Sequence, residues 1–126
     1  MLSLNKKFLF IHVPKTGGNS IQGILKNYSE DILISREKNK NGFDERFEIK
    51  NSNFKIKKHS TLSKYKKVLD SKIYESIFKF AVVRNPWDRA ISYYFSPNRG
   101  KVKWNKKRFI RFVKKMKPLR YYITEL

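Results

Sequence analysis

Residues 10–20, FIHVPKTGGNS, contain the turn that decides the fold of this chain. An uninterrupted apolar run over residues 8–13 ends at Pro14, which predicts a buried strand of the kind that parallel sheets contain. Two glycines follow the proline, and a helix is expected to begin near Asn19 or Ser20. The sequence therefore predicts a strand that passes through a tight turn directly into a helix.

The residue types in this turn suit a phosphate-like or sulfate-like anion. The first turn of a helix carries unpaired backbone N–H groups and the positive end of the helix dipole. Glycines let the backbone approach the anion closely, hydroxyl side chains add donors, and a lysine adds positive charge. The residues expected to contact the anion are Lys15, Thr16, Gly17, Gly18, Asn19 and Ser20. A plain strand-to-helix turn without a ligand is the alternative interpretation.

This turn differs from the phosphate loop of nucleoside triphosphatases. In that loop, GxxxxGK[ST], the lysine follows the glycines and is itself followed by a hydroxyl that holds Mg²⁺. Here Lys15 precedes Gly17 and Gly18. A metal-dependent nucleoside triphosphatase and a small-molecule kinase are therefore disfavoured, and we expect no metal.

A second strand end, at Arg84, repeats the arrangement. Residues 77–83, IFKFAVV, predict another apolar strand, and Asn85 and Pro86 are typical of a helix cap and a first helical position. An arginine at a strand end can grip phosphate oxygens with its planar fork, and Ser92 follows about two turns into the helix. Because ligands bind at the carboxyl edge of parallel sheets, we expect two neighbouring anion sites.

Residues 1–126 are expected to form a single domain. Residues 54–58 predict a short strand, and Ser60 or Thr61 predicts the cap of a following helix. Residues 29–53 lack a regular pattern and predict a long loop. The alternation of strands and helices predicts an α/β fold of the three-layer, P-loop-like kind, with a small central parallel sheet flanked by helices.

Two of the expected helices have an apolar face. The face of the helix after the first turn consists of Ile21, Ile24, Leu25 and Tyr28. A later helix is expected to begin near Asn105, with a face of Phe109, Phe112, Val113 and Met116. Because its other positions are mostly Lys and Arg, we expect residues 99–126 to form a basic helical segment.

The charge of the chain indicates an anionic partner. Lys and Arg number 30 against 10 Asp and Glu, which gives a formal net charge of +20. Residues 89–124 contain twelve of these cations and no acidic residue. An excess of this size favours association with any polyanion, so charge alone does not separate nucleic acid, acidic glycan, nucleotide and membrane surface.

The chain contains no cysteine, which excludes disulfides and thiolate metal sites. The apolar run before Pro14 is too short for a signal peptide, and no stretch approaches the ~18 apolar residues that a membrane-spanning helix needs. We therefore expect a soluble, cytoplasmic protein.

The two motifs together resemble those of the sulfotransferases that use 3′-phosphoadenylyl sulfate (PAPS). PKTGGNS at residues 14–20 and VVRNPWDRAISYYF at residues 82–95 carry the resemblance, which is closest to the carbohydrate sulfotransferase branch with its bacterial members. It implies that residues 15–20 hold the 5′-phosphosulfate and that Arg84 and Ser92 hold the 3′-phosphate. Asn19, often a threonine in that family, keeps a polar side chain.

The resemblance also implies a role for His59, in the sequence KKHSTL. A histidine placed there can take the proton of an acceptor hydroxyl, and its ordinary pKa near neutrality suits a base. A helix-capping or solvent-exposed histidine is an equally weighted interpretation. His12, inside the apolar strand, is expected to be a hydrogen-bonded core residue.

The implied reaction transfers a sulfuryl group from PAPS to a hydroxyl, and leaves adenosine 3′,5′-bisphosphate. Lys15 and His59 are the implied catalytic residues, and the acceptor is expected to be a carbohydrate, with an anionic polysaccharide suited to the basic C-terminal third. The alternative is a non-catalytic protein that binds polyanions. Trp104, Tyr121 and Tyr122 lie among the cations, so single-stranded nucleic acid is one possible partner.

Overall fold

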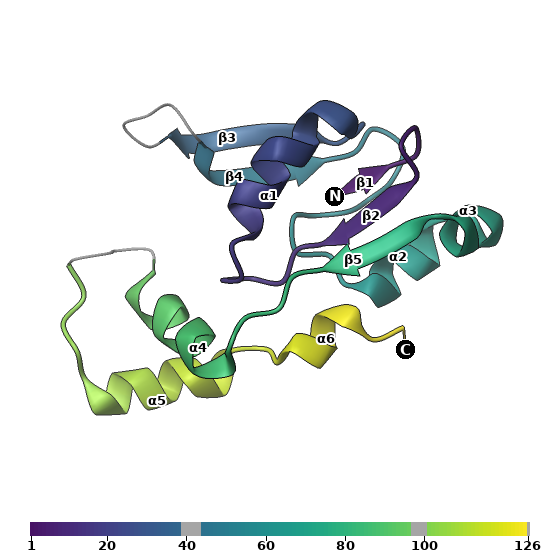
Figure 1. Cartoon of the computed structure of the whole chain (residues 1–126). Coiled ribbons are helices and arrows are strands. Elements are labelled where there is room, and N and C mark those ends of the chain that lie inside the picture. The colour runs from purple at the N-terminus through teal and green to yellow at the C-terminus, as the bar shows by residue number, and fades with distance from the viewer. Residues whose placement is uncertain (39–43, 97–100, 126) are drawn as a thin grey trace.

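The computed structural model of the chain describes residues 1–38, 44–96 and 101–125. Its central sheet has the strand order β1-β2-β5, with helices around it (Figure 1). Strand β2 (Phe8–Ile11) pairs in parallel with β5 (Phe78–Ala81) and antiparallel with β1 (Leu2–Ser3). The predicted α/β class is confirmed, with a small sheet that contains a parallel pair and is flanked by helices.

The third strand of the sheet is not the predicted one. Residues 54–58 form no strand, and the antiparallel β1 takes the position next to β2. The Ile56 N–H bonds to the Phe54 carbonyl at 3.0 Å, and this local turn replaces pairing with a neighbouring strand. The sheet is therefore mixed, and only β2 and β5 run in parallel.

The prediction of a long loop over residues 29–53 is wrong. Strands β3 (Ile32–Lys38) and β4 (Asp44–Lys50) pair there as an antiparallel hairpin, whose residues 39–43 lie outside the described part. Its base is tied to the main sheet, because the Asp31 carboxylate accepts the Leu2 N–H at 2.9 Å and the Asn51 side-chain amide at 2.8 Å. The many charged residues on this hairpin obscure its two-residue alternation.

The helices begin and end near their sequence signals. In chain order they are α1 (Gly18–Leu25), η1 (Lys26–Tyr28), α2 (Leu62–Val68), α3 (Ser71–Ser76), α4 (Pro86–Phe95), α5 (Lys106–Lys115) and α6 (Leu119–Ile123). Predicted caps are confirmed at Thr61 and Asn85, and Asn105, near which a helix was expected to begin, is also a cap. The side chains of all three accept N–H groups of the first helical turn. Helix α3 carried no signal strong enough for a prediction, and α6 lies within residues 99–126, where a basic helical segment was expected.

The predicted apolar face of α1 is wrong in part. Ile24 is 69% exposed and Tyr28 is 53% exposed, whereas the buried residues of α1 are Gly18 and Gln22. The face of α5 agrees better with the prediction, since Phe109 and Phe112 pack against the Tyr94 ring of α4, with centroids 5.6 and 5.7 Å away.

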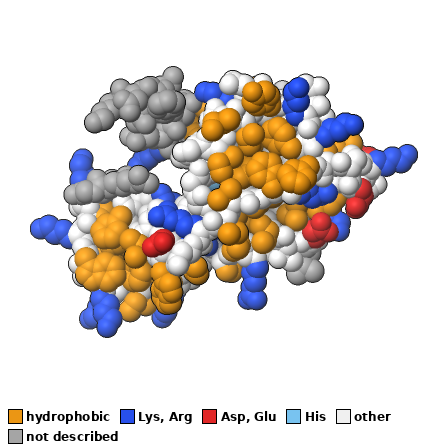
Figure 2. Space-filling model, in the orientation of Figure 1, with side chains coloured by type: hydrophobic (Ala, Val, Ile, Leu, Met, Phe, Trp, Pro, Cys, Tyr) orange, Lys and Arg blue, Asp and Glu red, His pale blue; other side chains and the backbone are white. Residues whose placement is uncertain are grey.

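The hydrophobic core lies around β2. Leu9, Phe10 and Val13 are fully buried, and Tyr65 from α2 and Tyr74 from α3 join them in one cluster. Figure 1 shows α4 and α5 side by side beyond the carboxyl ends of β2 and β5, while α3 lies at the opposite end of β5. Figure 2 shows hydrophobic side chains gathered over the sheet and Lys and Arg side chains spread around them.

We predict that Tyr94→Phe destabilises the packing of α4 against α5. The Tyr94 hydroxyl is buried, donates to the Lys103 carbonyl at 2.8 Å and accepts the Asn105 N–H at 3.0 Å. Its removal should lower the free energy of unfolding in urea by about 1–3 kcal/mol, because both hydrogen bonds of this hydroxyl to the residues before α5 are lost. Tyr121→Phe, at a half-exposed tyrosine of α6, is the control; an equal loss in both variants would contradict this interpretation.

Candidate functional site

The turn between β2 and α1 has an unusual backbone. Lys15 has a φ of 65° and Gly17 a φ of 83°, both in the left-handed region. For a lysine this conformation costs about 1–3 kcal/mol, and such strain is concentrated at functional sites. Gly17 is the N-cap residue of α1, and within the described part of the chain no side chain caps the helix there. The first N–H groups of α1 are thus suited to an anion.

The other side chains of the turn take different positions. Thr16 is buried, and its hydroxyl donates to the Val13 carbonyl at 2.7 Å. The single hydroxyl proton of Thr16, which we expected to face the anion, therefore holds the turn together. Asn19 is half-buried and Ser20 is exposed on the first turn of α1. Their contacts with an anion remain predictions.

Two arginines connect this turn to the segment after β5. Arg84 is exposed, and its Nη1 donates to the Lys15 carbonyl at 3.3 Å. Arg89 is 5% exposed and donates through Nε to the Pro14 carbonyl at 2.9 Å, and through Nη1 to the Lys117 carbonyl at 3.0 Å. The two strand ends therefore lie next to each other, as expected.

Arg89 is a residue whose importance the sequence did not reveal. Its guanidinium joins the first turn, α4 and the segment before α6. The sequence offered one indication of this role, because Arg89 follows Asn85 by four positions. The two residues therefore lie on the same side of α4, next to the end of the strand. Ser92 follows on α4, half-buried, and does not itself carry the connection between the motifs.

His59 lies beside the end of β2. Its Nδ1 is 2.9 Å from the His12 carbonyl oxygen, and the two imidazole rings meet edge to face with centroids 4.5 Å apart. Because a carbonyl only accepts, Nδ1 carries the proton and Nε2 keeps its lone pair. His59 is half-buried, and the cap of α2 is Thr61, so His59 is neither a helix cap nor a fully exposed histidine.

Burial lowers the pKa of His59 below its ordinary value of 6.5. The hydrogen bond to the His12 carbonyl opposes this shift, and the positive charge of Lys58 adds to it. His59 is therefore uncharged at neutral pH, with an unprotonated Nε2. This is the protonation state that a general base needs.

Lys58 is a second cation at this site that the sequence did not single out. It is 9% exposed, with its Nζ 3.8 Å from the centre of the Phe47 ring. Burial lowers the pKa of Lys58, Glu48 opposes the shift, and Lys15 adds to it. Lys58 and Lys15 therefore repel each other electrostatically. The electrostatic potential at the strand ends is positive.

The predicted core role of His12 is confirmed. The residue is 3% exposed, and its Nδ1 lies 2.7 Å from Oε1 of Gln22. Burial, the largest cause, lowers the pKa of His12 to about 3, so the ring is neutral at pH 7. A Cβ atom on Gly18 would lie 2.2 Å from the His12 ring, which explains the need for glycine at the start of α1.

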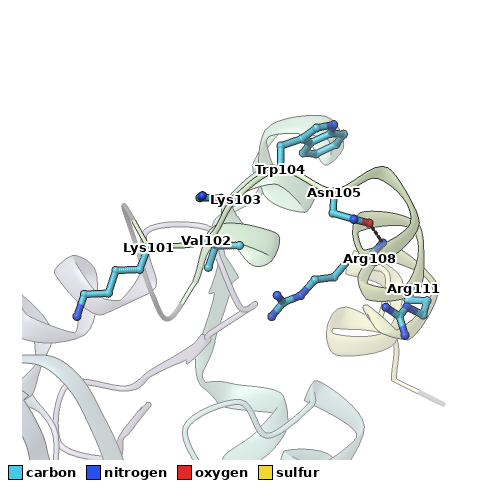
Figure 3. A pocket seen from close by; sticks show the side chains of 7 residues that line it. All are labelled: Lys101, Val102, Lys103, Trp104, Asn105, Arg108 and Arg111. Atoms are coloured by element: carbon cyan, nitrogen blue, oxygen red, sulfur yellow. Dashed lines mark hydrogen bonds between the residues drawn. The ribbon is translucent and has the colours of Figure 1, made fainter.

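A separate hollow lies at the start of α5. It has a volume of about 620 Å³, and its lining comes from residues 101–105, Arg108 and Arg111. Figure 3 shows Arg108 extending into the space beneath residues 102–105, whereas Lys101 points away from Arg108 and Trp104 points away from that space. Among the described residues the lining includes four cations and no carboxylate, so it suits an anionic group. The residues of the first turn do not line this hollow.

The chain belongs to the sulfotransferase family, whose model matches residues 1–121. The resemblance predicted from the two motifs is confirmed, and family membership supports sulfuryl transfer from a donor to an acceptor. Neither the curated proteins nor the solved structures gave a match to the chain. Within the described residues, no helix is both long and apolar enough to cross a membrane, and no three metal-ligating side chains cluster.

Gly18→Ala and Gly23→Ala form a matched pair of substitutions on α1. The added methyl group at Gly18 would collide with the His12 ring, whereas no atom lies within 4 Å of the corresponding position at Gly23. We expect Gly18→Ala to lower the free energy of unfolding by about 1–3 kcal/mol, through overpacking. Gly23→Ala should raise it by roughly 0.5–1 kcal/mol, because alanine is the better helix former. Thermal or urea unfolding measures both, and a neutral Gly18→Ala would contradict the close packing.

Proposed function

We propose that this chain transfers a sulfuryl group from PAPS to a hydroxyl of a carbohydrate acceptor. The contact between Arg84 and the Lys15 carbonyl is the observation that supports this most, because it joins the two segments that we expect to bind anions. A donor with separate 5′ and 3′ anionic groups matches such a pair. Family membership supports the sulfuryl transfer itself.

The residues present fit the two ends of such a nucleotide. Lys15, Gly17, Gly18 and the start of α1 suit the 5′-phosphosulfate, because they combine a charge, an uncapped helix start and close backbone approach. Asn19, Ser20 and the Thr16 backbone extend this set. At the other end, the exposed guanidinium of Arg84 suits the 3′-phosphate, with Ser92 as a further hydroxyl donor.

In the proposed reaction the donor supplies the sulfuryl group, and the acceptor oxygen forms a bond to sulfur while the bond from sulfur to the phosphate oxygen breaks. The acceptor proton passes to Nε2 of His59, the nitrogen that carries the lone pair. Lys15 and the N–H groups at the start of α1 stabilise the charge that develops on the leaving phosphate. Arg84 and Ser92 orient the nucleotide.

The basic hollow at the start of α5 supports an anionic polysaccharide as acceptor. It is lined by Lys101, Lys103, Arg108 and Arg111, and no carboxylate of the described part of the chain joins them there. Cations gathered in one concave region attract acidic polymers and raise their association rates.

The donor site is tested by calorimetric binding of adenosine 3′,5′-bisphosphate. Lys15→Ala and Arg84→Ala should each weaken binding by roughly tenfold to a hundredfold, as expected for a lost charge-assisted hydrogen bond. Lys72→Ala, at an exposed lysine of α3 beyond the other end of β5, is the matched control and should bind as the unmodified protein does. Full affinity in both site variants would rule out this assignment.

A second candidate function is polyanion binding without turnover, and the hollow at α5 favours it. This alternative predicts salt-sensitive binding of nucleic acid or sulfated glycan that ignores Lys15→Ala and is lost in the Arg108→Ala, Arg111→Ala double variant. A polysaccharide acceptor of the transferase would bind the same hollow, so Lys15-dependent binding of adenosine 3′,5′-bisphosphate, which only the transferase needs, is the result that distinguishes the two functions.

The pH dependence of turnover tests His59 as the base. Since its pKa is lowered, the unprotonated form persists below pH 6.5, and kcat should stay level from neutral pH down to that value. At lower pH the ring becomes protonated and kcat should fall. His59→Asn should lower kcat by roughly a hundredfold or more and remove the acidic limb of the profile. An acidic limb that persists in His59→Asn would show that another group is responsible.

A further inference from the structure

The buried face of α1 is unusual for a helix that packs on a sheet. Its buried residues are Gly18 and Gln22, four positions apart and thus on one face, and both meet the His12 ring. Aliphatic residues normally occupy such positions. Here, instead, a hydrogen-bonded polar pair lies between the helix and the end of β2.

The His12 ring has contacts on several sides. Phe10 stacks against it with ring centroids 5.9 Å apart, and the His59 ring meets it at 4.5 Å. The Gln22 Oε1 atom accepts the Nδ1–H at 2.7 Å, which sets both the rotation of the ring and its tautomer. The backbone carbonyl oxygen of His12 accepts the Nδ1–H of His59 at 2.9 Å.

Burial of Gln22 lowers the stability of the fold, and packing does not explain why a polar side chain stands there. Its side chain is fully buried, and within the described residues the Nε2 group has no hydrogen-bond partner. A buried donor without a partner is destabilising, so an apolar side chain of the same size would serve stability better. The role of Gln22 therefore lies in its amide oxygen, which accepts the hydrogen bond from His12.

We propose that His12 and Gln22 are positioning residues, which hold the His59 imidazole and the start of α1 in one relative arrangement. Gln22 orients the His12 ring, the ring supports α1 at Gly18, and the His12 carbonyl holds His59 with Nε2 free to accept a proton. Neither residue touches the reacting atoms. The proposal rests on the proposed function only for the role of His59 as base.

The test replaces Gln22 and follows both the histidine rings and turnover. Gln22→Met keeps the volume and removes the acceptor, whereas Gln22→Glu keeps an oxygen at the same reach. The chain has two histidines, so the ¹⁵N shifts of both rings are readily assigned. In the unmodified protein, both rings should carry the proton on Nδ1.

In Gln22→Met we expect the His12 ring to lose its fixed tautomer and the His59 nitrogens to shift, while the thermal midpoint stays the same or rises. Turnover should fall by roughly tenfold to a hundredfold through misplacement of the base, with binding of adenosine 3′,5′-bisphosphate unchanged. Gln22→Glu should restore the His59 shifts and most of kcat. Ile24→Ala, at an exposed residue of the same helix, is the control and should match the unmodified protein.

Unchanged His59 nitrogen shifts in Gln22→Met would overturn the positioning role, and so would equal losses of kcat and stability in the Met and Glu variants. A protein without sulfuryl transfer would instead contradict the proposed function. The nitrogen shifts need neither donor nor acceptor, so they decide the positioning role in that case as well.

Discussion

The parallel pairing of β2 with β5 is the constraint on which the site depends. Residues Phe8–Ile11 align with Phe78–Ala81 in an unbroken register, so the two strands end at the same edge of the sheet. Each strand continues into a turn and a helix, and the two turns consequently emerge side by side. Arg84 and Arg89 then join them through the carbonyl oxygens of Lys15 and Pro14. Without this pairing, the two sequence motifs, which are separated by about half of the chain, would not meet.

Positive charge is the second property that organises the site. Three cations lie near the strand ends, namely Lys15, Lys58 and Arg84. Burial lowers the pKa of Lys58, and the charge of Lys15 adds to this shift. Arg89 carries the same charge but is buried, and its guanidinium donates to the backbone carbonyls of Pro14 and Lys117. The exposed cations are thus accessible to a ligand, whereas the buried Arg89 stabilises the fold. Arg84 is exposed, whereas Arg89 is not.

Sequence patterns predicted the elements that have local causes. The strand before Pro14, the caps at Thr61 and Asn85, the helix that begins near Asn105, and the two motifs each depend on a few adjacent residues. The hairpin over residues 32–50 and the buried face of α1 were missed for a shared reason. The hairpin is held at its base by Asp31, and α1 buries Gln22 rather than Ile24, because of partners that are distant in the sequence.

The sequence by itself determined that residues 14–20 form a tight turn between a strand and a helix, because a proline and two glycines set its backbone locally. It also determined the family, since both motifs are continuous segments. Only the tertiary structure decided that the Thr16 hydroxyl faces inward, that Arg89 binds Pro14 and Lys117, and that His12 connects Gln22 with His59. Those contacts join residues from different elements, and their geometry depends on how the helices pack against the ends of β2 and β5.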